Sequence, residues 1–141
     1  MGGGSLSKEL IRLGYDVPLS TDLYDRNYGI SGIDFLHQTE VFEGNIITNP
    51  PFKQLTEFIL KGLELTSNKL YIFARIQTLE SIGRWDNIFK HYKPFLVCPF
   101  VKRIPCYPLG KTKKYGSAIS YAWFIWDINN LNVDPIVKWL V

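Results

Sequence analysis

Continuous hydrophobic runs alternate with helically spaced hydrophobic residues along most of this chain. Apolar residues that recur every three or four positions indicate amphipathic helices, whereas short unbroken apolar runs are typical of strands buried on both faces. On this basis helices are predicted over residues 5–13, 52–67 and 78–92. Strands are predicted over residues 15–20, 45–48, 70–76, 95–101 and 117–128, followed by a short apolar tail at 136–141.

Glycine, proline and polar residues interrupt this pattern between the elements. Gly14 stands where a terminator of the first helix belongs. Pro18 weakens the prediction of strand 15–20, because proline has no backbone N–H to donate to a ladder. Residues 25–32 are polar and contain glycine, so they are predicted to form a loop, and the apolar patch 33–36 is either an edge strand or a helical turn.

The order of these elements favours an α/β fold. Buried strands that alternate with helices are typical of a largely parallel sheet. Strand 117–128 follows strand 95–101 with no helix between them, which predicts an antiparallel pair at one edge of the sheet. With 141 residues, of which 46% are hydrophobic and 21% charged, the chain is expected to form a single domain over residues 1–141.

Composition narrows the class of protein further. Lys and Arg number 16 and Asp and Glu 13, a mildly basic balance that is compatible with a polyanionic partner without indicating one. No apolar run is long enough to span a bilayer and no secretory signal opens the chain, so a cytoplasmic location is expected. Cys98 and Cys106 are too few for a disulfide framework or a zinc cluster, and His37 and His91 are isolated, so no metal is expected.

The segment Asn49-Pro50-Pro51-Phe52 carries the clearest chemistry. It follows a predicted strand, and ligands of open α/β sheets bind at the carboxyl ends of strands. Asn49 offers an amide oxygen and Pro50 a rigidly held carbonyl, which together can accept both hydrogens of a planar amine. Phe52 offers a flat face on which a base can stack. The alternative is a plain connection between strand and helix, since Asn-Pro and Pro-Pro are turn formers.

Residues 45–52, Asn-Ile-Ile-Thr-Asn-Pro-Pro-Phe, resemble the catalytic motif of amino-group methyltransferases that depend on S-adenosylmethionine. Among these the segment is most similar to DNA adenine-N6 methyltransferases of the phage and restriction-modification type. Further resemblances to this family, in the same order along almost the whole chain, lie at residues 13–17 with 21–23, 28–29 with 33–36, 79–89 and 121–126. The family implies a Rossmann-like class I methyltransferase sheet with helices on both faces and an antiparallel edge strand.

The resemblance implies a role for each residue of the motif. Asn49, Pro50, Pro51 and Phe52 are expected to be catalytic. The Asn49 side chain and the Pro50 carbonyl would bind the target amine, which attacks the methyl group of S-adenosylmethionine directly. Phe52 would stack on the adenine, which must leave the duplex because its amine is otherwise enclosed in the base stack.

The resemblance also implies a binding site for S-adenosylmethionine, formed by Gly2, Gly3, Gly4, Asp22, Asp34 and Phe35. Asp22 would accept hydrogen bonds from the ribose hydroxyls, Asp34 would meet the adenine amine of the cofactor, and Phe35 would pack near its ring. The alternatives are a helix or turn cap for Asp22, and turn chemistry with a core aromatic residue for Asp34 and Phe35.

DNA is the partner that the resemblance implies. Lys53 lies beside the motif, and the basic segment 102–116 contains Lys111, Lys113 and Lys114. These four lysines are the predicted contacts with nucleic-acid phosphates. A solvated surface loop is the alternative for segment 102–116.

The chain departs from the family at its beginning. The cofactor loop of the family follows a first strand and an acidic residue, whereas here Met1 is followed directly by glycines and Ser5. The glycines are either the second half of that loop or an expression linker. A sheet that lacks its first strand has open central edges, which predicts a homodimer formed along them. A fragment, a start codon assigned too far downstream and a decayed gene all fit this departure.

The sequence therefore predicts an S-adenosylmethionine-dependent N6-adenine DNA methyltransferase, or a truncated remnant of one. A catalytically inactive module that binds nucleic acid or another chain is the alternative from a different class. A methyltransferase for another planar amine, in a protein glutamine or an RNA base, is a further alternative.

Overall fold

The structure, a computed structural model, describes residues 3–104 and 119–141. The chain divides into two compact units, an N-terminal unit, Met1–Gln38, and a sheet unit, Thr39–Val141. The single domain predicted over residues 1–141 thus contains two units, and it stays a prediction. Within the described ranges, no helix has both the length and the apolar character needed to cross a membrane.

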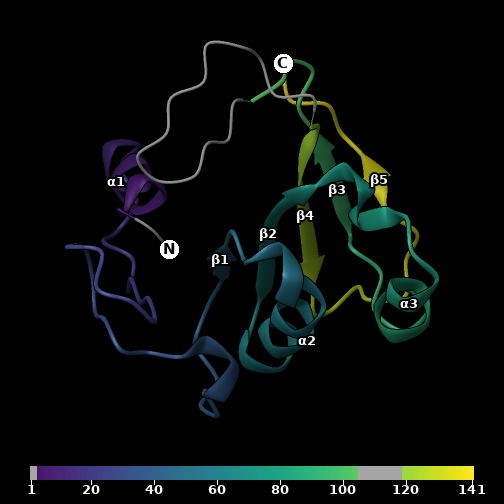
Figure 1. The fold of residues 1–141 in the computed structure, drawn as a ribbon. Coiled ribbons are helices and arrows are strands. Elements are labelled where there is room, and N and C mark those ends of the chain that lie inside the picture. Colours follow the sequence, from purple (N-terminus) through teal and green to yellow (C-terminus); the bar gives the residue numbers. More distant parts are fainter. Residues whose placement is uncertain (1–2, 105–118) are drawn as a thin grey trace. The chain divides into compact units, whose positions relative to one another are not determined.

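The sheet unit is built on a mixed five-stranded sheet with the order β1-β2-β4-β3-β5 (Figure 1). Its strands are β1 (Ile46–Thr48), β2 (Lys69–Arg75), β3 (Leu96–Pro99), β4 (Tyr121–Asp127) and β5 (Ile136–Val137). β1 is parallel to β2 and β3 is parallel to β5, whereas β4 is antiparallel to both of its neighbours. The predicted α/β class is therefore confirmed, although the sheet is mixed rather than largely parallel.

The predicted place of the antiparallel strand was wrong, because β4 lies inside the sheet and β1 and β5 form its edges. The composition of β4 explains its position. Tyr121, Ala122, Phe124 and Trp126 are buried, and the residues between them are half-buried. A strand with apolar side chains on both faces loses least water-exposed area when it is covered on both faces and paired on both sides. The apolar tail supplies the parallel edge strand β5 instead.

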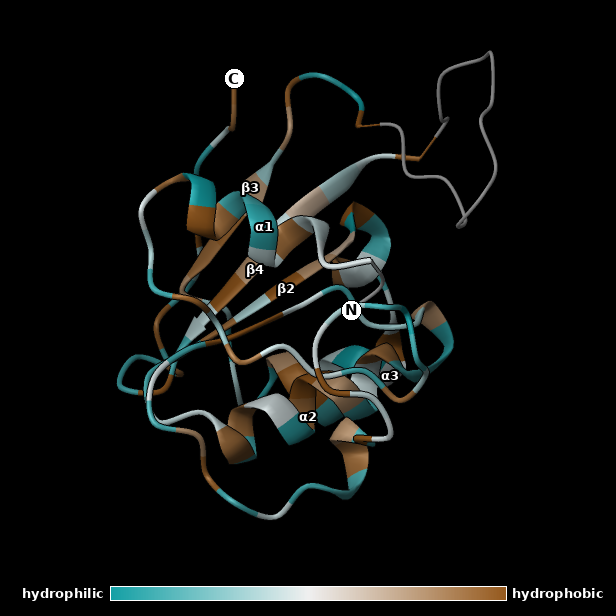
Figure 2. Ribbon diagram, turned by 90° about the vertical axis from the view of Figure 1, so that its left-hand side faces the viewer, coloured by the Kyte–Doolittle hydropathy of each residue, from teal (hydrophilic) through white to brown (hydrophobic). Residues whose placement is uncertain are grey.

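The helices of the sheet unit cover one face of the sheet. The 3-10 turn Phe52–Gln54 leads into α2 (Leu55–Leu65), and α3 (Ile82–Arg84) continues as the π-helical turn Trp85–Phe89. Figure 2 shows the strands largely in hydrophobic colours and α2 in two colours, as an amphipathic helix on a sheet requires. Because α1 belongs to the N-terminal unit, helices on both faces stay a prediction.

The core lies between these helices and every second residue of the central strands. It consists of Leu55, Ile59, Leu70, Ile72, Ala74, Ile88, Phe89, Val97, Ala122, Phe124 and Trp126. Burying each large apolar side chain stabilises the fold by about 1.5–3 kcal/mol. The buried Trp126 also satisfies its one donor, since its indole N–H donates to the Tyr92 carbonyl at 3.0 Å. These contacts hold the carboxyl ends of β1 and β2 in place, where the motif lies.

The helix predicted over residues 78–92 is broken into three short pieces. A 3-10 turn, Ile76–Leu79, comes first, and α3 begins only after Ser81, whose hydroxyl accepts a hydrogen bond from the Arg84 N–H. The Arg84 guanidinium holds the intervening backbone out of a helical path by donating to the carbonyls of Gln77, Thr78 and Glu80. The helical spacing of this segment did not reveal that contact.

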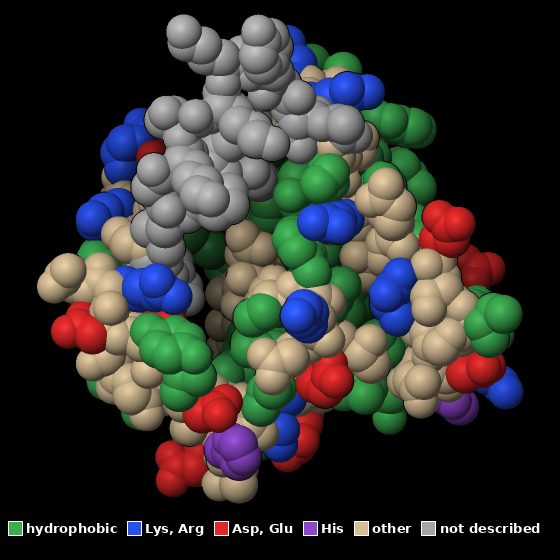
Figure 3. All heavy atoms as spheres, in the orientation of Figure 1, with side chains coloured by type: hydrophobic (Ala, Val, Ile, Leu, Met, Phe, Trp, Pro, Cys, Tyr) green, Lys and Arg blue, Asp and Glu red, His purple; other side chains and the backbone are tan. Residues whose placement is uncertain are grey.

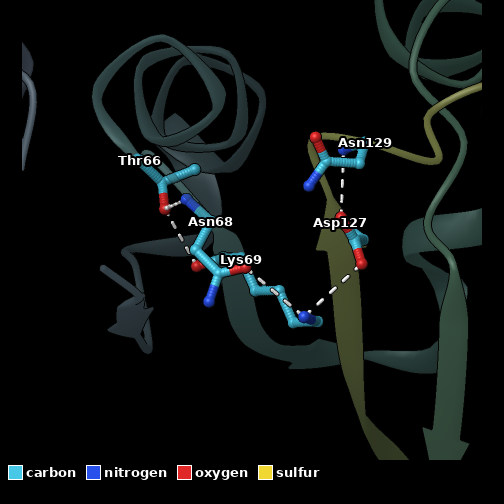
Figure 4. Close-up of polar contacts among 5 residues, drawn as sticks. All are labelled: Thr66, Asn68, Lys69, Asp127 and Asn129. Atoms are coloured by element: carbon cyan, nitrogen blue, oxygen red, sulfur yellow. Dashed lines mark hydrogen bonds and ion pairs between the residues drawn. The ribbon is translucent and has the colours of Figure 1, made fainter. Parts of the chain in front are cut away.

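A charged pair links β2 and β4 at the end of the sheet that lies away from the motif (Figure 4). The register places Lys69 of β2 opposite Asp127 of β4, and the Lys69 Nζ lies 3.4 Å from the Asp127 carboxylate. The backbone N–H of Asn129 donates to the same carboxylate at 3.0 Å. The hydrogen bond from Asn129, followed by the charge of Lys69, lowers the pKa of Asp127.

Thr66 joins the end of α2 to the start of β2 beside this pair (Figure 4). Its buried hydroxyl donates to the Gly44 carbonyl at 2.8 Å and accepts a hydrogen bond from the Asn68 N–H at 3.3 Å. One side chain thus satisfies backbone groups on both sides of the connection, which would otherwise be left without partners away from water.

The N-terminal unit contains the first predicted helix but not the first predicted strand. α1 (Ser5–Arg12) confirms the helix, whereas residues 15–20 form no strand, and the nearest ladder contact is an isolated bridge between Thr21 and Ile30. The physical reason is the absence of a partner, since the described part of this unit contains no extended strand beside residues 15–20 and Pro18 cannot donate. Residues 35–37 form a 3-10 turn, so the helical alternative for the patch 33–36 was the right one.

Candidate active site

The motif lies where the sequence predicts it, directly after β1 and before α2. Thr48, the last residue of β1, pairs with Ile72, so β2 continues past the end of β1 to Arg75. The motif therefore runs alongside the last residues of β2. The Pro51 carbonyl accepts the Gln54 N–H at 3.0 Å, which turns the chain into the helix.

Two acceptors of the motif are left without internal partners. Asn49 is exposed and Pro50 is buried. Among the described residues, neither the Asn49 side chain nor the Pro50 carbonyl takes part in a hydrogen bond, whereas the Pro51 carbonyl does. The exposed Asn49 amide oxygen is thus available to a ligand, and the carbonyl of the buried Pro50 is a second acceptor without a partner among the described residues.

Phe52 is the exposed member of a cluster of aromatic rings on the sheet face opposite α2. Its side chain is 45% exposed, and its ring centroid lies 6.3 Å from that of Tyr121. Phe73 stacks on Tyr121, with centroids 5.1 Å apart and planes 7° apart. Trp123 and Phe100 contact Phe73 at 5.3 and 6.1 Å. In this aromatic cluster the other rings support Phe52, whose exposed part is open to a ligand. The cluster consists of Phe52, Phe73, Phe100, Tyr121 and Trp123.

Arg75 adds a charge to the cluster. Its Cζ atom lies 4.1 Å from the centroid of the Phe52 ring, so the guanidinium covers part of that ring. Sequence reasoning missed both Arg75 and Tyr121, which face each other in the register of β2 and β4. The available signal was a single charged side chain in the apolar run 70–76, but its meaning depends on strand pairing.

The predicted cofactor residues Gly3 and Gly4 have local roles in the N-terminal unit, and Gly2 lies outside the described residues. Gly4 precedes α1 with a φ of +77°, and a Cβ atom there would lie 2.3 Å from the Tyr28 ring. Its missing side chain thus makes room for Tyr28 rather than for a ligand. The exposed Gly3 carbonyl accepts a hydrogen bond from the Lys8 Nζ at 3.1 Å.

The predicted cofactor carboxylates hold turns of the same unit. Asp22 accepts the Tyr24 N–H at 3.0 Å. Asp34 caps the 3-10 turn by accepting the Leu36 N–H at 3.0 Å, and its other oxygen lies 2.8 Å from the His37 Nδ1. The His37 contact, followed by the Leu36 bond, lowers the pKa of Asp34. These are the contacts expected from the turn-chemistry alternative.

The described hollow of the N-terminal unit is not lined by the predicted cofactor residues. Phe35 is half-buried within the 3-10 turn that Asp34 caps. A shallow open hollow of this unit is lined by residues 17–20 and 28–30, and it includes none of the predicted cofactor residues. The predicted roles of Asp22, Asp34 and Phe35 toward the methyl donor therefore stay predictions that rest on the resemblance.

Lysines near the motif are less informative than Arg75. Lys53 is exposed on the 3-10 turn beside Phe52, and Lys111, Lys113 and Lys114 lie outside the described residues. On the face drawn in Figure 3, basic and acidic side chains are interspersed over the helices and strands of the sheet unit. Contact with a polyanion would thus depend on individual cations at the site.

Other reactive side chains of the described ranges do not form a second centre. No group of three or more His, Cys, Asp or Glu side chains there is arranged to hold a metal ion. Cys98 is a free, buried thiol, and burial raises its pKa, which disfavours the reactive thiolate. Cys106 lies outside the described residues.

Comparisons of the chain with protein-family models, with curated proteins and with solved structures found no match. The interpretation of the site therefore rests on the motif Asn49–Phe52 and on the geometry around it. The methyltransferase resemblance stays a prediction of the sequence.

Proposed function

We propose that this chain is an adenine-N6 DNA methyltransferase that uses S-adenosylmethionine, or a remnant of one without turnover. The observation that carries the proposal is a pair of acceptors without partners among the described residues, the Asn49 amide and the Pro50 carbonyl, in the same motif as the exposed ring of Phe52 at the carboxyl end of β1. Such ends of parallel strands are where ligands of α/β sheets bind.

The arrangement suits a planar aromatic amine in particular. The two acceptors can hold both N–H groups of the amine, which would direct the lone pair of the nitrogen toward an electrophile. Phe52 supplies a stacking surface for the ring that carries the amine, and base–aromatic stacking contributes about 1–3 kcal/mol. An adenine inside a duplex must be flipped out to reach both.

The sequence resemblance is the reason for proposing S-adenosylmethionine as the methyl donor. It supplies an activated methyl group when bound, while the residues of the sheet unit bind and orient the acceptor. The contacts of Gly4 and Asp34 within the N-terminal unit are the reason that a remnant without turnover is part of the same proposal.

The test is methyl transfer by the purified chain, with a version extended upstream assayed in parallel. Tritium from the methyl group of labelled S-adenosylmethionine should appear at N6 of adenine in DNA, and calorimetry should show binding of the donor. Adenine in RNA and a glutamine peptide serve as competing acceptors. If neither version binds the donor, the active-enzyme claim is withdrawn; label found in the peptide instead of DNA would reassign the acceptor.

A homodimer is part of the proposal, since β1 has a neighbour on one side only in the described sheet. An unpaired strand edge is a template for a second copy. Sedimentation at micromolar concentration should give the mass of two chains, and a single species with the mass of one chain would exclude this partner.

A further inference from the structure

Arg75 is a cation that forms no ion pair with the described residues. It is the last residue of β2 and is half-buried against the Phe52 ring. Its Nε–H is buried and has no hydrogen-bond partner, and no carboxylate of the described residues forms an ion pair with it. The other partly buried cations near the sheet, Lys69 and Lys93, lie against Asp127 and Asp134.

An unpaired guanidinium in a half-buried site is unusual on physical grounds. Buried charges are ordinarily paired, because taking a charge and its donors out of water costs free energy that only a partner returns. Stacking on Phe52 compensates in part, but a ring face provides no acceptor for an N–H in the guanidinium plane. An anion from outside the described residues would supply the partner that this guanidinium lacks among them.

The surroundings of Arg75 indicate which anion this is. The guanidinium lies 4.1 Å from the centre of the ring on which we place the acceptor base, and the exposed Asn49 lies three residues before that ring in the same motif. A nucleotide carries its phosphate within one sugar of its base, so a base stacked on Phe52 brings a phosphate to this side of the sheet. Guanidinium groups match phosphate oxygens in geometry and charge.

We infer that Arg75 binds a backbone phosphate of the nucleotide whose base stacks on Phe52, so that the acceptor is a polynucleotide and not the side chain of a protein. This inference rests on the proposed function, because the proposal puts the acceptor on Phe52, and it adds the residue that binds the phosphate of that acceptor. A glutamine side chain has the amine that Asn49 and Pro50 can hold, but it has neither the aromatic ring nor the phosphate.

The experiment measures binding without any methyl donor, so that its outcome is independent of turnover. A fluorescently labelled single-stranded oligonucleotide with one central adenine is titrated with the purified chain, and anisotropy is followed at several salt concentrations. Single-stranded DNA avoids the cost of base flipping. A second oligonucleotide has neutral methylphosphonate linkages on both sides of the adenine. The variants are Arg75→Gln, Arg75→Lys and, as a control with the same change of charge, the exposed Lys90→Gln.

The unchanged chain should bind the natural oligonucleotide about tenfold more tightly than the neutral one. Arg75→Gln should remove this preference and should reduce the dependence of log K on log salt by about 0.7, the value for one phosphate contact on a single strand. Lys90→Gln should retain the preference. Arg75→Lys should retain the salt dependence, and it replaces Arg75→Gln if circular dichroism shows that the glutamine variant is unfolded.

Three outcomes would overturn the inference. They are an Arg75→Gln chain that still prefers the natural linkage, a folded wild-type chain that binds neither oligonucleotide, and a glutamine peptide that competes as well as DNA. Phosphate-dependent binding in a chain that transfers no methyl group would exclude the active enzyme, would favour the remnant without turnover, and would support the role of Arg75. Methyl transfer to adenine at the same rate in Arg75→Gln as in the unchanged chain would support the proposed activity and contradict the role of Arg75.

Discussion

Phe52 and Asn49 are neighbours in one short motif, yet the structure uses them differently. Phe52 is anchored by contacts from two strands, with Arg75 on β2 and Tyr121 on β4. The Asn49 side chain has no hydrogen bond to the described residues, and Asn49 is exposed. An exposed polar side chain contributes little to stability, so its replacement can separate a role in binding the amine from a role in the fold.

Asn49→Ala should therefore reduce methyl transfer without changing the free energy of unfolding. Losing one preorganised hydrogen-bonding group at a reacting centre typically lowers the rate by about 10²–10³-fold. The measurement is the initial rate of methyl transfer at saturating DNA, with urea unfolding as the check on stability. Asn45→Ala, an exposed asparagine just before β1, is the matched control. Equal rates for the two variants would remove Asn49 from the site.

At the scale of elements, the connection from α2 to β2 determines where the sheet begins. Thr66 is 4% exposed and bonds with its hydroxyl to Gly44 and Asn68. Gly44 precedes β1 and Asn68 precedes β2, so this one residue aligns the two parallel strands at their amino ends. The motif at the opposite ends of these strands depends on that alignment.

Thr66→Val keeps the shape of the side chain and removes the hydroxyl. It should lower the free energy of unfolding by about 1–3 kcal/mol, because the carbonyl of the half-buried Gly44 and the N–H of the half-buried Asn68 lose their partner. Equilibrium unfolding in urea measures the difference. Thr56→Val, at a half-buried position of α2 with no such bond among the described contacts, should change stability much less. A Thr66→Val chain as stable as the control would contradict the role of the hydroxyl.

The pair of Lys69 and Asp127 should make the stability of the sheet depend on pH. The pKa of Asp127 is lowered in the folded chain, first by the Asn129 N–H and then by Lys69. A carboxyl with a lowered pKa in the folded state stabilises the fold above its unfolded pKa, near 4, and this contribution is lost as pH falls through the folded value. Melting temperatures between pH 2.5 and 6 should thus fall less steeply with acid in Asp127→Asn than in the unchanged chain. Parallel curves for the two proteins would exclude Asp127 as a source of acid sensitivity.

At the scale of the whole molecule, the two units differ in how their residues are buried. The sheet unit has a continuous apolar core between its helices and strands. Within the described part of the N-terminal unit, the buried residues are Gly4, Ser7 and Ser20, and no large hydrophobic side chain is fully buried. The hydroxyls of Ser7 and Ser20 lie 2.8 Å apart, a contact that is weak in comparison with an apolar core.

Hydrogen exchange should therefore separate the two units. Amides of β2 and β4, which pair over seven residues each within the core, should exchange slowest, near the rate set by global unfolding. Amides of α1 should exchange faster by about two orders of magnitude or more, because local opening of the helix exposes little apolar area. Mass spectrometry of peptides from the two units measures this. Equal protection of α1 and β2 would show that the N-terminal unit is stabilised as strongly as the sheet.

The local elements could be predicted because their signals are local. Strand 45–48 ends at two prolines that cannot continue a ladder, and it is confirmed as β1; the helical spacing after Phe52 is confirmed as α2. The run 70–76 is confirmed as β2, and Trp123 and Trp126 lie on opposite faces of β4, as residues three apart in a strand must. The sequence alone thus determined the α/β class and the position of the motif at the end of a buried strand.

The tertiary structure decided everything that depends on pairing between distant segments. The place of β4 between β2 and β3 brings Tyr121 and Arg75 to Phe52, and no spacing in the sequence encodes that register. The missing strand at residues 15–20 has the same cause, since a strand forms only where a neighbour takes its hydrogen bonds. Propensity and periodicity act within a few residues, whereas strand order and an unpaired guanidinium beside a ring arise only when the whole sheet has assembled.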